Sequence, residues 1–167
     1  SFCRGVTSYI NQIYRVSQNL HRMKQHPEER LTASVAIFSC ERKEVWMIGD
    51  CQAIVDQVYY NNDKPDEAVI AAKRSQLIKQ GVAPNEARRL IEPMLVRSVI
   101  GGQNKSYAVV DGFPVFMQGV IEIPAHSEVV LATDGYPFLR STLAESEITL
   151  SQQLRKDPQN IQTFLAT

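Results

Sequence analysis

Two β-rich runs that lie three residues apart constrain the fold of this chain more than any other feature. They are TASVAIFSC at 32–40 and EVWMIGDCQAIVDQVYY at 44–60, joined by the polar segment Glu41-Arg42-Lys43. Three residues can close a hairpin, whereas parallel strands need a crossover of roughly a dozen residues. The sequence therefore predicts an antiparallel hairpin of residues 32–38 and 45–55, with Trp46 partly buried.

Helical patterns lie on both sides of these strands. Apolar residues at mostly three- and four-residue steps predict a helix over residues 5–25 that covers the sheet and ends at His26-Pro27. A second helix is predicted over residues 62–81, with Pro65 near its first turn and Gly81 at its end. These helices would form a layer against the strands.

The second half of the chain continues this mixture. A helix from Asn85 should kink or split at Pro93 and stop at Gly101-Gly102, and residues 141–166 form a last helical pattern that Pro158 divides. Ser141 and Thr142 are suited to cap that last helix. Between these helices, residues 105–123 and 127–132 return to strand composition, and Asp111-Gly112 predicts a tight hairpin turn.

The order of elements is helix, two strands, two helices, several strands and helix. A doubly wound parallel sheet needs strands and helices that alternate singly, which this order does not provide. The sequence predicts a layered α+β domain with helices over mostly antiparallel sheets. With 167 residues, we expect residues 1–167 to form a single domain.

Charge and composition narrow the class of partner and compartment. Eighteen basic and eighteen acidic residues leave no net charge, which disfavours a nucleic-acid partner. No apolar run is long enough to suggest a membrane span. Cys3, Cys40 and Cys51 follow no metal or redox spacing, which favours reduced thiols and a cytoplasmic protein. The oligomeric state is not predicted.

A second Asp-Gly pair, Asp134-Gly135, differs in context from the first. It ends the apolar run SEVVLA at 127–132, and the residues that follow it contain no partner strand. A carboxylate at the end of a rigid strand is well placed to bind a hard divalent cation. It could equally cap the loop that follows, and the pattern leaves both alternatives open.

The segment VVLATDGYPFL resembles the strand-end motif of the metal-dependent protein phosphatases, the protein phosphatase 2C-like family, in which L-A-[ST]-D-G follows an apolar strand. TASVAIFSCERKEVWMIGDCQAIV is similar to an earlier hairpin of that family, which ends in V-G-D-S-R. The order and separation of the two motifs also match, over roughly residues 1–150.

This resemblance implies a four-layer αββα sandwich without the family's N-terminal strands, and two Mn²⁺ or Mg²⁺ ions in a complete member. It implies Asp134 as a metal ligand and Asp50 as a weaker metal position. Gly49, Thr133 and Gly135 would support the site, with Gly135 allowing a close backbone turn. The substrate of an active member would be a phosphoprotein, hydrolysed by a metal-activated water.

The chain also departs from the family pattern. It has no counterpart of the early R-x-x-N-x-D and D-G-H-G-G segments, and the late D-N motif is missing, with only Asp157 near that region. The sequence therefore predicts a fragment of a longer phosphatase-like chain or a catalytically incomplete relative. No catalytic residue is identified, and the two metal ions are not expected in this chain by itself.

Two alternatives remain. The first is a non-enzymatic binding or scaffold domain of the same fold. The second is a proteasome-like amino-terminal nucleophile hydrolase, because Thr32-Ala33-Ser34 begins a strand as the catalytic threonine does in that family. That chemistry needs a free α-amine beside the hydroxyl, and Thr32 lies inside the chain.

Overall fold

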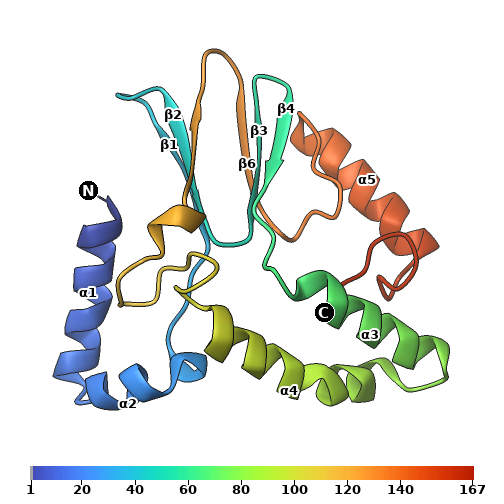
Figure 1. Cartoon of the computed structure of the whole chain (residues 1–167). Coiled ribbons are helices and arrows are strands. Elements are labelled where there is room, and N and C mark those ends of the chain that lie inside the picture. The colour runs from blue at the N-terminus through green and yellow to red at the C-terminus, as the bar shows by residue number, and fades with distance from the viewer. Residues whose placement is uncertain (1) are drawn as a thin grey trace.

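The computed structural model describes residues 2–167 and shows an α+β domain with two small antiparallel sheets (Figure 1). The strands are β1 (Val35–Ser39), β2 (Glu44–Ile48), β3 (Cys51–Val55), β4 (Val58–Asn61), β5 (Ile121–Pro124) and β6 (Val129–Thr133). The α-helices are α1 (Phe2–Val16), α2 (Leu20–Gln25), α3 (Glu67–Lys79), α4 (Pro84–Gly102) and α5 (Leu143–Lys156). Two short 3₁₀ turns, η1 (Pro27–Glu29) and η2 (Met117–Gly119), complete the elements.

The predicted hairpin forms in part. β1 and β2 pair antiparallel from Val35 opposite Ile48 to Ser39 opposite Glu44, and Trp46 is partly buried. The predicted strand 45–55 is wrong as one element, because the chain bends at Gly49-Asp50. Its second half, β3, leaves the β1-β2-β5 sheet and becomes the central strand of the β4-β3-β6 sheet.

The bend depends on Gly49. Its φ of +78° lies in the left-handed region, and a Cβ atom there would come within 2.4 Å of Ser34 Oγ and 3.0 Å of Ser34 Cα. A side chain would therefore be strained both by the backbone conformation and by the contact with Ser34, which precedes β1. Glycine is required where the chain passes from one sheet to the other.

The two sheets share one apolar core. Its buried residues come from both sheets and from the loop after β5: Val45, Met47, Cys51, Ala53, Val55, Ile123 and Ala125. Every second residue of β2 and β3 points into this core, as expected for strands packed face to face. The structure shows two small sheets with helices. It does not confirm the predicted four-layer sandwich.

The predicted first helix is interrupted. α1 ends at Val16, α2 begins at Leu20, and Gln18 between them has a φ of 59°. Cys3, Val6 and Ile10 of α1 pack against a second apolar cluster that contains Ile48. The prediction that this helix lies against the sheet is thus met at one end of the β1–β2 pair.

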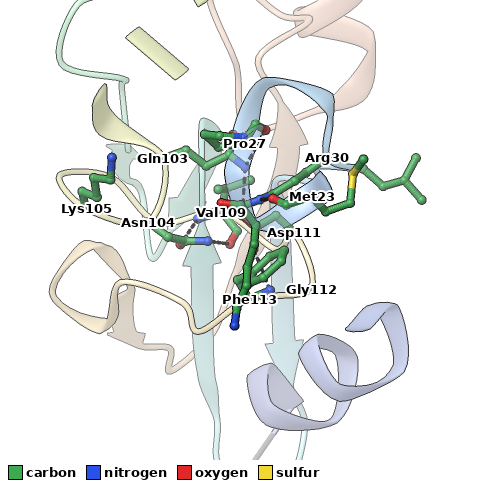
Figure 2. A network of polar contacts seen from close by, with 12 residues as sticks. Met23, Pro27, Arg30, Gln103, Asn104, Lys105, Val109, Asp111, Gly112 and Phe113 are labelled. Carbon is green, nitrogen blue, oxygen red and sulfur yellow. Dashed lines mark hydrogen bonds and ion pairs between the residues drawn. The ribbon is translucent and has the colours of Figure 1, made fainter. Parts of the chain in front are cut away.

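The hairpin predicted at Asp111-Gly112 is wrong. Residues 107–116 form an irregular loop, and the Asp111 side chain is fully buried, with 0% of its surface exposed. It accepts hydrogen bonds from Arg30 Nη1 and Gln103 Nε2, both at 2.8 Å, and Arg30 also lies 3.9 Å from the centroid of the Phe113 ring (Figure 2). A buried charge must be paired, so this carboxylate joins the loop to α4 and to the segment after α2.

The remaining helices form near their predicted positions, with three differences. The first is that the helix predicted over residues 62–81 begins only at Glu67 and ends at Lys79. α3 is followed by Gly81 at φ +92°, and α4 ends at Gly102 but runs through Pro93 as one helix. Thr142 caps α5, because its Oγ1 accepts the backbone N–H of Glu145 at 3.2 Å. The helical pattern predicted beyond Pro158 is wrong, since α5 ends at Lys156 and the following segment is irregular.

We expect Gly49→Ala to destabilise the fold by at least about 2 kcal/mol, because it combines a left-handed backbone with a clash against Ser34. Gly101→Ala is the matched control: it lies in α4 with no atom within 4 Å of the added Cβ. Urea unfolding should show a loss only for Gly49→Ala. Equal stability of the two variants would contradict the role given to the bend.

Asp111→Asn should cost about 3–5 kcal/mol, because it leaves the largely buried Arg30 guanidinium without its counter-charge. Glu29→Gln breaks the exposed Arg22–Glu29 pair of the same region and should cost below about 1 kcal/mol. Chemical denaturation of both variants measures the difference. A similar small loss for both would contradict the importance of the buried pair.

Candidate functional site

The two aspartates of the matched motifs come together at one end of the β4-β3-β6 sheet. Cys51 of β3 pairs with Thr133 of β6 in antiparallel register. Asp50 precedes Cys51 and Asp134 follows Thr133, so both carboxylates stand at the same end of neighbouring strands. A cavity of about 410 Å³ opens there, and both aspartates line it.

Asp50 is held by two partners on different elements. Ser34 Oγ donates to Asp50 Oδ1, and Lys64 Nζ, from the segment before α3, forms an ion pair with Asp50 Oδ2. Burial alone raises the pKa of Asp50, but the hydrogen bonds from Lys64 and Ser34 outweigh it and leave the pKa below its ordinary value. Asp50 is thus an ionised carboxylate that already has a cation beside it.

Lys64 shows the reciprocal effect. Burial lowers the pKa of its ammonium, but the hydrogen bond and charge of Asp50 raise the pKa above the ordinary lysine value overall. Lys64 is therefore protonated at neutral pH, and its ammonium forms an ion pair with Asp50.

Glu67, at the start of α3, lines the same cavity; its backbone N–H donates to the carbonyl oxygen of Lys64 at 3.2 Å, and the charge of Lys64 acts on its carboxylate. Burial raises the pKa of Glu67; the charge of Lys64 lowers it, and Asp50, Asp134 and Asp63 raise it further. No sequence pattern distinguishes Lys64 or Glu67 as site residues, because charged residues of both types are ordinary at the start of a helix.

Gln52 fixes the loop that carries Asp134. Its side chain is buried, and Nε2 donates to the carbonyl oxygens of Thr133 at 2.9 Å and Tyr136 at 2.8 Å. Tyr59 donates its hydroxyl to Gln52 Oε1 at 3.0 Å. Gln52 therefore supports the loop that carries Asp134.

The three residues predicted to support the site differ in their geometry. Gly49 makes the bend that places Asp50, whereas Thr133 and Gly135 are exposed. A Cβ atom on Gly135 would meet only Thr133 Oγ1 at 3.4 Å, an ordinary contact, so the backbone there does not demand glycine. We predicted that Gly135 allows a close backbone turn, but the conformation at this position does not require glycine.

The residues present do not fit a two-metal centre. Among residues 2–167, no group of three or more histidine, cysteine, aspartate and glutamate side chains is placed to hold a metal ion. Asp134 is exposed, and Asp50 is occupied by Lys64. Cys51 does not add a ligand, because burial raises the pKa of its thiol to about 11.

Other carboxylates noted from the sequence have structural partners. Asp157 is buried and accepts the backbone N–H groups of Ile161, Gln162 and Thr163, so it organises the segment after α5. Burial raises the pKa of Asp157, but these hydrogen bonds together lower it by more than burial raises it. The pKa of Asp157 therefore lies below the usual range. Asp157 is not a candidate site residue.

Thr32 and Ser34, the residues of the nucleophile hypothesis, line a neighbouring cavity. Thr32 is exposed and precedes β1. Ser34 Oγ donates a hydrogen bond to Asp50 Oδ1, so its hydroxyl already has a partner. No helix of that described part is both long and apolar enough for a membrane crossing.

Comparison with known proteins assigns no family. No protein-family model matches this sequence, and no curated protein or solved structure matches it significantly.

Lys64→Met should reduce stability by about 1 kcal/mol at neutral pH, because it leaves the Asp50 carboxylate unpaired. The folded-state pKa of Asp50 is depressed, so its stabilising contribution exists above its unfolded pKa of about 4 and is lost as the pH falls through the folded pKa. The raised pKa of Lys64 gives a contribution that exists below about pH 10 and is lost at higher pH.

The stability difference between wild type and Lys64→Met should therefore be largest between about pH 5 and 9 and should shrink below about pH 3. Lys73→Met, on an exposed position of α3, is the control and should change stability little at any pH. Urea unfolding across this pH range measures both. A difference that does not depend on pH would contradict the pairing.

Proposed function

We propose that this chain is a phosphoprotein phosphatase-like domain of the metal-dependent class, in which Asp50 and Asp134 form the carboxylate edge of the site. One observation carries this proposal: the two aspartates of the matched motifs stand at the ends of paired strands and line one cavity. The resemblance needs this arrangement, and a chance match of two short motifs would not require it.

Residues 2–167 do not supply phosphatase chemistry by themselves. In-line phosphoryl transfer in this class needs cations to neutralise charge and to generate hydroxide. One exposed carboxylate and one carboxylate paired with lysine cannot hold two ions in fixed positions. The proposal is therefore a phosphatase-like domain that is inactive unless further ligands complete the Mn²⁺ or Mg²⁺ centre.

Within this site the chain's own residues have three roles. Lys64 and Ser34 hold and orient Asp50, and Gln52 holds the backbone on both sides of Asp134. Gly49 sets the path of the chain into β3. These are positioning roles, and they fix the spacing of the two carboxylates.

A non-enzymatic binding domain of the same fold is the second candidate. The Lys64–Asp50 ion pair favours it, because this pair neutralises a carboxylate that a metal centre would use. The two candidates differ in whether Asp134 responds to a divalent cation.

The 167-residue chain should show no Mn²⁺-dependent hydrolysis of p-nitrophenyl phosphate or of a phosphoserine peptide above the background without protein. Turnover that depends on Mn²⁺ and disappears in Asp134→Asn would contradict the inactivity, and it would show that other residues complete the centre.

Millimolar Mn²⁺ should broaden the amide NMR signals of residues 133–136 and 50–52, because the paramagnetic ion is attracted weakly to Asp134. Asp134→Asn should remove this broadening, since an amide is a poor ligand for a hard cation. Asp66→Asn, an exposed carboxylate outside the cavity, is the control. Absence of broadening in the wild type would favour the non-enzymatic binding domain, and broadening that survives in Asp134→Asn would contradict the assignment of Asp134 as the ligand.

A further inference from the structure

The segment after α5 forms part of the wall of both cavities. Residues 158–167, which we call the strap, leave α5 and return to α3 (Figure 1). Residues 164–167 line the larger cavity, which contains Asp50 and Asp134. Thr167 also lines the smaller cavity, of about 190 Å³. The two cavities therefore share the strap as a wall.

Hydrogen bonds within the segment fix the shape of the strap. The buried Asp157 carboxylate accepts the backbone N–H groups of residues 161–163 at distances between 2.7 and 3.1 Å. Ala166 donates its backbone N–H to the carbonyl oxygen of Asn160 at 3.1 Å. These bonds lie within residues 157–166, so they keep the strap folded on itself without joining it to the rest of the domain.

Two neighbouring side chains of α3 attach the strap to the domain. Ser75 Oγ donates to the carbonyl oxygen of Ile161 at 2.7 Å. Arg74 Nη1 donates to the carbonyl oxygens of Gln159 at 3.0 Å and Ala166 at 3.3 Å. A single guanidinium therefore holds the strap near both of its ends.

The strap depends on these polar contacts more than on apolar burial. None of residues 158–167 is buried, although the Phe164 ring packs edge-on against Phe138 with centroids 6.2 Å apart. Arg74 Nε is buried and has no hydrogen-bond partner among residues 2–167, and opening of the strap would give this N–H group access to water. A segment with few buried apolar contacts opens at a lower free energy than the whole domain unfolds.

We propose that residues 158–167 open as a local unit, with Arg74 as the latch, and that this opening controls access to the two cavities. In the closed state residues 164–167 form a wall of the larger cavity. In the open state that side of the cavity faces solvent, and the buried Gln52 side chain, which also lines it, gains exposure. This inference concerns access alone and does not depend on the proposed function.

Hydrogen exchange of the wild type tests the local opening. The amides of residues 161–163 and of Ala166 should exchange at a rate that depends little on denaturant concentration, whereas those of Ala53 and Val55 in β3 should exchange only as the domain unfolds. The same denaturant dependence for both groups would overturn the proposal, because the strap would then open only with the whole domain.

Arg74→Met tests the latch. It should speed exchange of the Ala166 amide about tenfold, because it removes two hydrogen bonds from a charged donor. Lys73→Met, at an exposed position of the same helix, is the matched control and should leave this exchange unchanged. Should Arg74→Met fail to fold, Ser75→Ala removes the bond to Ile161 and should speed exchange about threefold to tenfold. Wild-type exchange rates in the folded variants would contradict the latch.

The neutral nitroxide 4-hydroxy-TEMPO measures access to the larger cavity without needing a ligand, because it broadens the NMR signals of groups that solvent reaches. The Gln52 side-chain amide should be broadened more in Arg74→Met than in the wild type, and the amide of Ala53, which is fully buried, should be equally sharp in both. Faster strap exchange in Arg74→Met with unchanged broadening of Gln52 would show that the strap opens without controlling access, and it would overturn this part of the proposal.

Discussion

The bend at Gly49 is the constraint on which the rest of this structure depends. It ends β2, sends β3 into the other sheet and leaves Asp50 at the point where the two sheets meet. The contact with Ser34 that excludes a side chain at Gly49 also brings the Ser34 hydroxyl to Asp50. One residue without a side chain therefore determines both the division of the strands into two sheets and the position of the candidate site.

Carboxylates in this protein serve distinct purposes that their residue type does not reveal. Asp111 is buried against Arg30 and joins three segments, as Figure 2 shows. Asp56 accepts the backbone N–H groups of His126, Glu128 and Ser127, which lower the pKa of its carboxyl group well below the usual range and hold the turn between β5 and β6. Asp50 and Asp134 differ from these because they open on a cavity.

Lys64 and Glu67 line both cavities and contribute opposite charges to the wall between them. Lys64 is the cation beside Asp50, and its charge also lowers the pKa of Glu67, whereas burial and the charges of Asp50, Asp134 and Asp63 raise that pKa. The larger cavity thus has an acidic wall with too few fixed ligands for a metal centre. In the smaller cavity Lys64 and Glu67 lie among apolar side chains and Tyr107.

The sequence by itself determined the local elements and the motif residues. The three-residue turn required β1 and β2 to be antiparallel, Gly81 and Gly102 ended their helices, and the Thr142 cap fixed the start of α5. These features depend on neighbours in the chain, so local patterns were sufficient to predict them.

Tertiary structure alone decided which partners those residues acquired. The hairpin expected at Asp111-Gly112 is absent because burying the Asp111 charge against Arg30, 81 residues away, requires an irregular loop. The pairing of Asp50 with Lys64, and the meeting of Asp50 and Asp134 on one cavity, likewise arise from distant segments. Local patterns carry no information about such contacts, because their free energy depends on burial and on charges that only the folded chain brings together.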